Sequence, residues 1–205
     1  MTAPPRKLSA AAQLAERVQR YLEQFYGLEQ APSIEAFLRC VDDGARESVR
    51  IRDAADGEVE IEVLTPALSS SQEPDLDTLC QLIEGVSHFV YVAERARRRL
   101  PTTQLELELQ AEVDKYVLLV WQKTPFRPEL ARRIHARLYE RVRFCHDEGT
   151  EEGDRYRLAN GLAARFVHRL ERLYLSKGHT NALRGALHRF YGMGQADKLQ
   201  LARAA

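Results

Sequence analysis

The sequence predicts a mainly α-helical protein of the α+β class, with about six or seven helices and one two-stranded antiparallel β-hairpin. The helices are predicted because apolar residues recur every three or four positions over most of the chain. The strands are predicted because the period changes to two within residues 49–63. The longest helical pattern, residues 75–121, is interrupted once, at Pro101, and therefore predicts a central antiparallel helical hairpin.

The two arms of this helical hairpin carry their own start and stop signals. Arginines crowd the end of the first arm, between Arg95 and Arg99, where the helix dipole favours cations. Thr103 and Glu106 have the spacing of a capping box, which predicts the start of the second arm. Apolar residues at helical spacing are expected to form the core, among them Leu82, Val86, Phe89, Val90, Leu109, Val113, Tyr116 and Val117.

The segment with period two predicts the β-hairpin. Valine and isoleucine alternate with arginine in residues 49–52 and with glutamate in residues 58–63. The five residues between these strands have the composition of a turn. A symmetric turn would place Arg52 opposite Glu58, so that opposite charges face each other. Because an isolated ribbon of two strands is marginal in water, we expect its apolar face to pack on helices or on another chain.

The remaining patterns predict further helices and one linker. Helices are expected at residues 9–29, 33–41, 128–146, 154–176 and 180–191, with one more after residue 195. Serine and proline in residues 65–74 predict a linker. We expect a single domain over residues 1–205, with helices and the β-hairpin at 9–64, the linker at 65–74 and a helical core at 75–205.

The composition is typical of a globular protein and excludes several classes. The 205-residue chain has a formal net charge of zero, with 29% charged residues. No apolar run is long enough to span a membrane, and the N-terminus lacks the apolar segment of a signal peptide. Cys40, Cys80 and Cys145 are an odd, scattered set that favours free thiols in a reducing compartment. We therefore expect a cytoplasmic protein that does not associate with a membrane.

Charge is divided unevenly along the chain. Residues 1–124 contain 14 basic and 21 acidic side chains, whereas residues 125–205 contain 16 basic and 9 acidic side chains. One interpretation is that the two parts attract each other, within one fold or between two copies. The other is that the basic part faces an acidic partner or a nucleic acid.

Acids and a histidine on the predicted helical hairpin could hold a metal ion. Glu84 and His88 lie one turn apart on the first arm, and Glu108 and Glu112 lie one turn apart on the second. Di-iron and di-manganese bundles use such residues, but they repeat a Glu-x-x-His motif that this sequence lacks. We therefore favour a solvated face with a Glu–His contact, and expect no metal and no cofactor. A metal-dependent helical-bundle enzyme is the first alternative.

Arginines are concentrated in the helices predicted at residues 128–146 and 154–176. The guanidinium group suits phosphate and carboxylate because it donates two parallel hydrogen bonds. Acids are interleaved, and no DNA- or RNA-binding motif is present, which disfavours nucleic acid as the partner. Binding through these basic helices is the second alternative. The candidate binding residues are Arg133, Arg137, Arg141, Arg165 and Arg169, with Tyr139, Tyr156 and Tyr174 as aromatic rings that could stack on bases.

No arrangement for nucleophilic catalysis is evident. Cys145 and His146 are adjacent in sequence, and adjacent side chains on a helix point apart. A phosphate-binding loop, a Gly-x-Ser-x-Gly motif and paired zinc cysteines do not occur in the sequence. We therefore predict no catalytic residues. The expected function is that of a non-enzymatic cytoplasmic protein, of the adaptor or regulatory type, that binds another protein or a second copy of itself.

Overall fold

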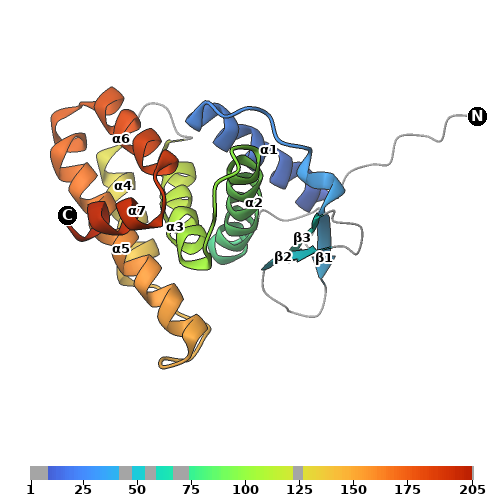
Figure 1. The fold of residues 1–205 in the computed structure, drawn as a ribbon. Helices are drawn as coiled ribbons and strands as arrows, with labels where there is room; N and C mark the ends of the chain where they lie inside the picture. The colour runs from blue at the N-terminus through green and yellow to red at the C-terminus, as the bar shows by residue number, and fades with distance from the viewer. Residues whose placement is uncertain (1–8, 42–47, 54–58, 67–73, 122–126, 205) are drawn as a thin grey trace, which may run out of the picture. The chain divides into compact units, whose positions relative to one another are not determined.

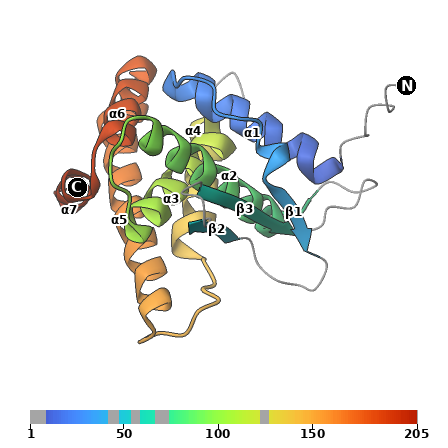
Figure 2. The same ribbon diagram turned by 45° about the vertical axis from the view of Figure 1, so that its right-hand side comes forward.

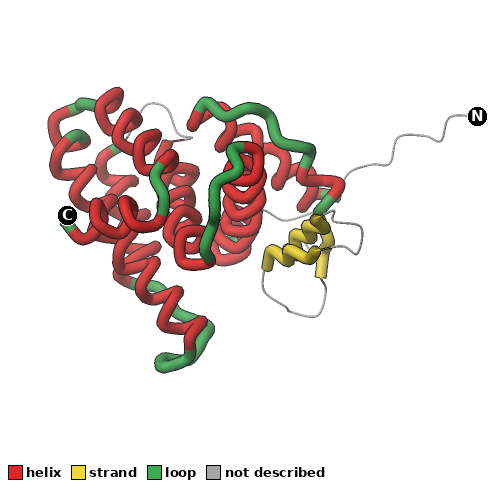
Figure 3. The backbone as a smooth tube through the Cα atoms, in the orientation of Figure 1, coloured by secondary structure: helices red, strands yellow, loops and turns green. Residues whose placement is uncertain are grey.

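The computed structural model describes residues 9–41, 48–53, 59–66, 74–121 and 127–204 (Figure 1). These residues form seven α helices and one small sheet, so the prediction of a mainly helical protein is confirmed (Figure 3). The chain divides into two compact units, Met1–Ala93 and Glu94–Ala205. The expectation of a single domain stays a prediction. Within the described ranges, no helix combines the length and the apolar character that a membrane span requires.

The first unit contains two helices, one short turn and the sheet. In chain order these elements are helix α1 (Ala10–Tyr26), the 3₁₀ turn η1 (Ile34–Ala36), strands β1 (Leu38–Val41), β2 (Ser48–Asp53) and β3 (Val59–Pro66), and most of helix α2 (Leu76–Arg97). Helix α1 starts at the cap residue Ser9, whose Oγ accepts a hydrogen bond from the backbone N–H of Ala12 at 3.2 Å. It ends at Gly27 in the left-handed conformation, with φ 64°.

Two buried polar residues tie the segment after α1 back onto that helix. The amide nitrogen of Gln19 donates to Glu23 Oε1 at 2.8 Å and to the Pro32 carbonyl at 3.0 Å. The amide oxygen of Gln19 accepts the backbone N–H of Ile34 at 2.9 Å. Glu23 Oε1 also accepts the backbone N–H of Ala31 at 3.0 Å. Side chains of α1 therefore satisfy backbone groups of the loop that would otherwise need water.

The predicted short helix at residues 33–41 is wrong. One 3₁₀ turn, η1, is followed directly by strand β1. This strand runs parallel to β3 with Leu38 opposite Val63, and the backbone N–H of Val63 donates to the Phe37 carbonyl at 2.9 Å. The segment with helical spacing is too short to determine the structure, because a single helical turn stabilises these residues less than pairing along a strand does.

The predicted sheet is wrong in strand number and in register. It has three strands in the order β1-β3-β2, and not the two of a lone hairpin (Figure 2). Strand β2 pairs antiparallel with β3, with Arg52 opposite Glu60 instead of Glu58. A shift of two residues leaves each residue on its own face, so arginines still lie opposite glutamates in the register. Of the predicted linker, Thr65 and Pro66 belong to β3, and residues 67–73 lie outside the described residues.

The second unit is helical throughout its described part. In chain order it contains the end of α2, helix α3 (Gln104–Trp121), helix α4 (Pro128–His135), the π turn η2 (Ala136–Glu140), helix α5 (Glu151–Leu173), the 3₁₀ turn η3 (Leu175–Lys177), and helices α6 (Thr180–Gly192) and α7 (Gln195–Arg203). The cap at Thr103 is confirmed, because its Oγ1 accepts the backbone N–H of Glu106 at 3.2 Å. The antiparallel packing of α2 on α3 concerns both units and stays a prediction.

The predicted helix at residues 128–146 is wrong in its second half. Helix α4 passes into the π turn η2, where the backbone N–H of Arg141 donates to the Ala136 carbonyl at 3.0 Å. Bonds to neighbouring helices stabilise this wider turn. The Leu138 carbonyl accepts the Asn160 amide at 3.1 Å, and the Tyr139 hydroxyl donates to the Glu112 carbonyl at 2.9 Å.

Helix α5 is the longest helix of the second unit, and the sequence misplaced both its ends. It starts after the cap residue Thr150 instead of at residue 154. Leu158 and Leu173 continue the apolar spacing of this helix in the sequence, yet they are 43% and 40% exposed. Its buried face packs on α6, where the rings of Phe166 and Phe190 stack with centroids 4.1 Å apart.

Replacement of two glycines on α5 by alanine should change the free energy of unfolding in opposite directions. A Cβ on Gly153 would overlap the backbone oxygen of Asp147, whereas a Cβ on Gly161 would meet nothing within 4 Å. We expect Gly153→Ala to lower the free energy of unfolding by about 1–3 kcal/mol, since the backbone must shift. Gly161→Ala should raise it by up to about 1 kcal/mol, because alanine loses less entropy in a helix. Urea denaturation measures both, and equal effects would contradict the close approach at Gly153.

Candidate functional site

The acids and the histidine first considered for a metal ion are divided between the two units. Glu84 and His88 lie in the first unit, and Glu108 and Glu112 lie in the second. All four are buried, so the predicted solvated face is wrong. Glu112 is held within the second unit, where its carboxylate accepts Lys115 Nζ at 2.9 Å and the Asn160 amide at 3.1 Å. The alternative that these four side chains form a metal site stays untested.

A different set of metal-binding side chains converges within the second unit. His135 at the end of α4 meets His168 and Glu171 of α5, and one possible ligand atom from each lies within 4.8 Å of the others. His168 is exposed, and the other two are half-buried. This set was not predicted, because the metal-binding pattern considered in the sequence was that of the central helical hairpin. The sequence pattern that could have indicated it is a His-x-x-Glu pair, His168 and Glu171, in the predicted helix that follows the one containing His135.

Neighbouring groups fix the orientation of these side chains. The Tyr116 hydroxyl donates to Glu171 Oε1 at 2.7 Å. Burial and the Glu171 carboxylate raise the pKa of Tyr116 well above its ordinary value, so the hydroxyl remains a donor. Nδ1 of His135 lies 3.6 Å from Glu140 Oε1, and the ring packs edge-on against Tyr139 with centroids 5.0 Å apart.

A second polar cluster is buried where α7 meets α3. Lys198 is fully buried, and its Nζ donates to Gln110 Oε1 at 2.7 Å and lies 5.1 Å from the Phe190 ring. Gln110 in turn donates to Asp114 Oδ1 at 2.9 Å. On the same side of α3, Glu106 Oε1 lies 3.5 Å from the guanidinium Nη2 of Arg95.

The Lys198 amine has an unusual proton affinity. Burial is the main cause that lowers its pKa to about 7; Glu106 and Asp114 oppose this shift, and Arg95 contributes to it. Because the folded pKa lies below the unfolded one, this group makes the protein more stable as pH rises from about 7 towards 10.5. An amine of this kind is a possible nucleophile. We interpret it instead as an anchor for α7, because the side chain is enclosed and hydrogen-bonded.

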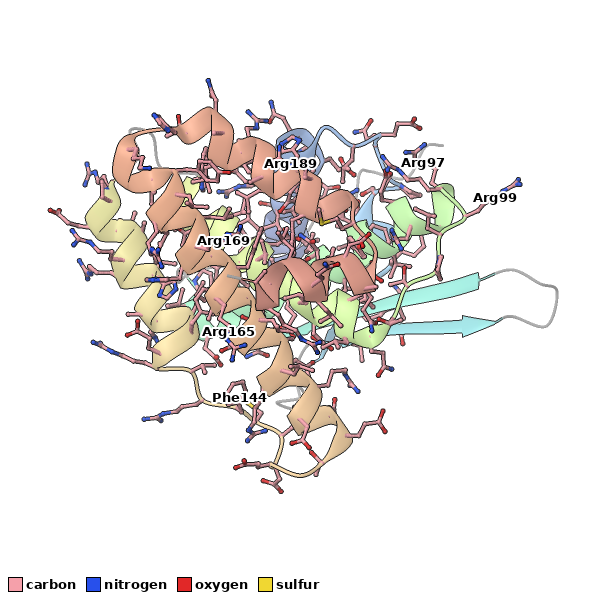
Figure 4. All side chains as sticks on the ribbon, turned by 60° about the vertical axis from the view of Figure 1, so that its left-hand side comes forward. Arg97, Arg99, Phe144, Arg165, Arg169 and Arg189 are labelled. Atoms are coloured by element: carbon pink, nitrogen blue, oxygen red, sulfur yellow. The ribbon has the colours of Figure 1, made fainter. Side chains whose placement is uncertain are left out.

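The arginines predicted to bind a partner are mostly exposed. Arg133, Arg137, Arg141 and Arg165 are exposed. Arg169 is half-buried, and its Nη1 donates to the Ala204 carbonyl at 3.3 Å (Figure 4). Within the described ranges, no ion pair engages Arg133, Arg141 or Arg165.

Two of the three tyrosines proposed to stack on bases already contact other residues. Tyr139 is buried and donates its hydroxyl to α3. The ring of Tyr156 stacks on His146 with centroids 5.1 Å apart. Tyr139 and Tyr156 are therefore not available to stack on the bases of a single-stranded nucleic acid.

Comparison of the chain with protein-family models, with curated proteins and with solved structures finds no match. The candidate sites are therefore distinguished by their own chemistry. The exposed arginines could bind a macromolecule, whereas the histidine–glutamate set could bind a small ion.

Proposed function

We propose that the protein is non-enzymatic and acts by binding another protein that presents acidic side chains. The binding surface consists of the exposed arginines of α4, η2 and α5. One observation supports this proposal above the others: Arg133, Arg141 and Arg165 are exposed, and no ion pair engages them within the described residues. Exposed guanidinium groups can form paired hydrogen bonds with carboxylates of a partner.

The surroundings of these arginines favour a protein over a nucleic acid. Glu140, on η2 between Arg137 and Arg141, has a side chain that is 64% exposed and would repel phosphates. Leu158 lies two turns before Arg165 on α5 and is 43% exposed. Protein interfaces are enriched in arginine and bury apolar side chains beside it, whereas a phosphate backbone gains nothing from an exposed leucine.

A cytoplasmic location belongs to the same proposal. Cys145 is an exposed thiol that takes part in no disulfide within the described part of the chain. Exposed thiols persist in a reducing compartment and tend to oxidise outside it. A partner in the same compartment would meet the arginine surface at moderate ionic strength, where charge complementarity speeds association.

A charge-reversal variant tests the arginine surface. Arg133→Glu, Arg141→Glu and Arg165→Glu, introduced together, should reduce recovery of the native partner in a cross-linked pull-down by at least about tenfold, because like charges now oppose its acids. The thermal midpoint of the variant should stay close to that of the unchanged protein, because these side chains are exposed. Quantitative mass spectrometry of the recovered proteins measures the change.

The matched control reverses three exposed arginines of α6 and α7, namely Arg184, Arg189 and Arg203. This control should retain the partner. Equal recovery with both variants would contradict the proposed surface. Recovery of RNA or DNA instead, with binding that falls steeply with salt and is lost only in the first variant, would support the nucleic-acid alternative.

A further inference from the structure

We propose that His135, His168 and Glu171 form a binding site for a divalent transition-metal ion, for which Zn²⁺ is the probe. The site goes beyond the proposed function and does not depend on it. Two imidazoles and one carboxylate bring their ligand atoms within 4.8 Å of one another, from helices α4 and α5. Three protein ligands of this kind, completed by water, are the usual donor set of an open zinc site.

Neighbouring groups already contact two of the three side chains. The Tyr116 hydroxyl donates to Oε1 of Glu171, so Oε2 is the carboxylate oxygen without this hydrogen bond. The Nδ1 atom of His135 faces Glu140, and its Nε2 lies 3.5 Å from the carbonyl of Ala164, one turn before His168 on α5. The carbonyl of Ala164 can only accept a hydrogen bond, so an ion bound at Nε2 of His135 takes the place of this long contact, while Glu140 lies beside the other ring nitrogen.

The π turn η2 is an independent observation that points to the same place. It begins directly after His135, and its wider ring brings Glu140 back beside the His135 imidazole. A regular α helix would turn residue 140 away from residue 135, since residues five apart do not share a face. Single π turns of this kind are frequent at functional sites. Here the turn places a carboxylate 3.6 Å from the Nδ1 atom of His135.

The donor set selects among metal ions. Nitrogen ligands favour Zn²⁺, Co²⁺ or Ni²⁺, whereas Mg²⁺ and Ca²⁺ require oxygen ligands throughout. Arg165 and Arg172 lie one turn to either side of His168 on α5. Their positive charge opposes the ion and lowers its affinity, but it favours an anion as the remaining ligand. We therefore expect one ion per chain with an exchangeable water or anion.

Titration of the full-length chain, prepared without a histidine tag and stripped of metal, tests the site. Isothermal calorimetry with Zn²⁺ should show one strong site per chain. Co²⁺ should give a visible absorption band with the intensity of a four- or five-coordinate ion. His168→Ala should weaken Zn²⁺ binding by more than about tenfold and abolish that band, because one of three ligands is lost. Glu171→Gln, which keeps the shape of the side chain, should do the same.

Two further variants make the test specific. Tyr116→Phe removes a positioning residue and should weaken Zn²⁺ binding about tenfold while the Co²⁺ band persists with altered shape. His179→Ala removes an exposed histidine at the start of α6 and should change neither the Zn²⁺ affinity nor the Co²⁺ absorption band. The proposal is overturned if the unchanged protein binds Zn²⁺ weakly at several sites, or if His168→Ala and His179→Ala behave alike. Neither result would bear on the partner pull-down, so the two proposals fail separately.

Discussion

Glu106→Ala is expected to lower the free energy of unfolding of the second unit by about 3–5 kcal/mol. Glu106 is 2% exposed and lies 3.5 Å from the guanidinium of Arg95, which is itself buried. The carboxylate also offsets the positive charge of Lys198. Its removal leaves two buried cations with less compensation, which costs more than the loss of any one contact. Urea denaturation followed by circular dichroism measures the change.

The loss caused by Glu106→Ala should depend on pH in a defined direction. The pKa of Lys198 is about 7, so this amine is mostly neutral at pH 9 and mostly charged at pH 6. The destabilisation should therefore be greater at pH 6, where Glu106 compensates two cations, than at pH 9, where it compensates Arg95 alone. Glu152→Ala, on the exposed first turn of α5, is the control and should cost under about 1 kcal/mol. An equal cost for both variants would contradict the buried cluster.

Long helices could be predicted from the sequence because each carries several turns of one pattern. Helices α1, α2 and α3 lie within a few residues of their predicted ends, and the cap at Thr103 is where the sequence suggested. Strand β1 could not be predicted in this way. Its four residues become a strand only by pairing with β3, which is some twenty residues further along the chain, and no local pattern reports such a partner.

The π turn η2 escaped prediction for the same reason. The apolar spacing of Leu130, Ile134 and Leu138 continues through it as if the helix were regular. What changes the backbone is a pair of tertiary hydrogen bonds, from Asn160 and to the Glu112 carbonyl, made by residues far away in the sequence. These bonds also bring Glu140 beside His135. The local geometry of the proposed metal site therefore depends on tertiary contacts that the sequence pattern does not contain.

Helix α3 shows why polar residues were misjudged. Glu108 and Glu112 were expected to face solvent or to form a metal site, yet most of the helix is buried. The polar side chains bind different neighbours: Gln110 accepts a hydrogen bond from Lys198 of α7, and Glu112 accepts one from Asn160 of α5. A helix surrounded on several sides needs polar partners in specific places, and the hydrophobic period alone does not reveal them.

Gln19→Leu is expected to lower the free energy of unfolding of the first unit by about 2–4 kcal/mol. The amide of Gln19, which is 4% exposed, makes three hydrogen bonds, and leucine of similar size can make none. The backbone N–H of Ile34, the Pro32 carbonyl and Glu23 would lose a partner in a place that water reaches poorly. The segment between α1 and η1 should then detach before the rest unfolds. Hydrogen exchange of the Ile34 amide reports this step directly.

The control for Gln19→Leu is Gln24→Leu, on the exposed side of the same helix. It makes the same chemical change and should alter stability by under about 0.5 kcal/mol. Glu23→Gln provides a second comparison, because the Ala31 N–H can still donate to the remaining amide oxygen while the buried charge is removed. If Gln19→Leu and Gln24→Leu were equally mild, the loop would be held by the burial of Ile34 alone, and the hydrogen bonds of Gln19 would contribute nothing measurable to the fold.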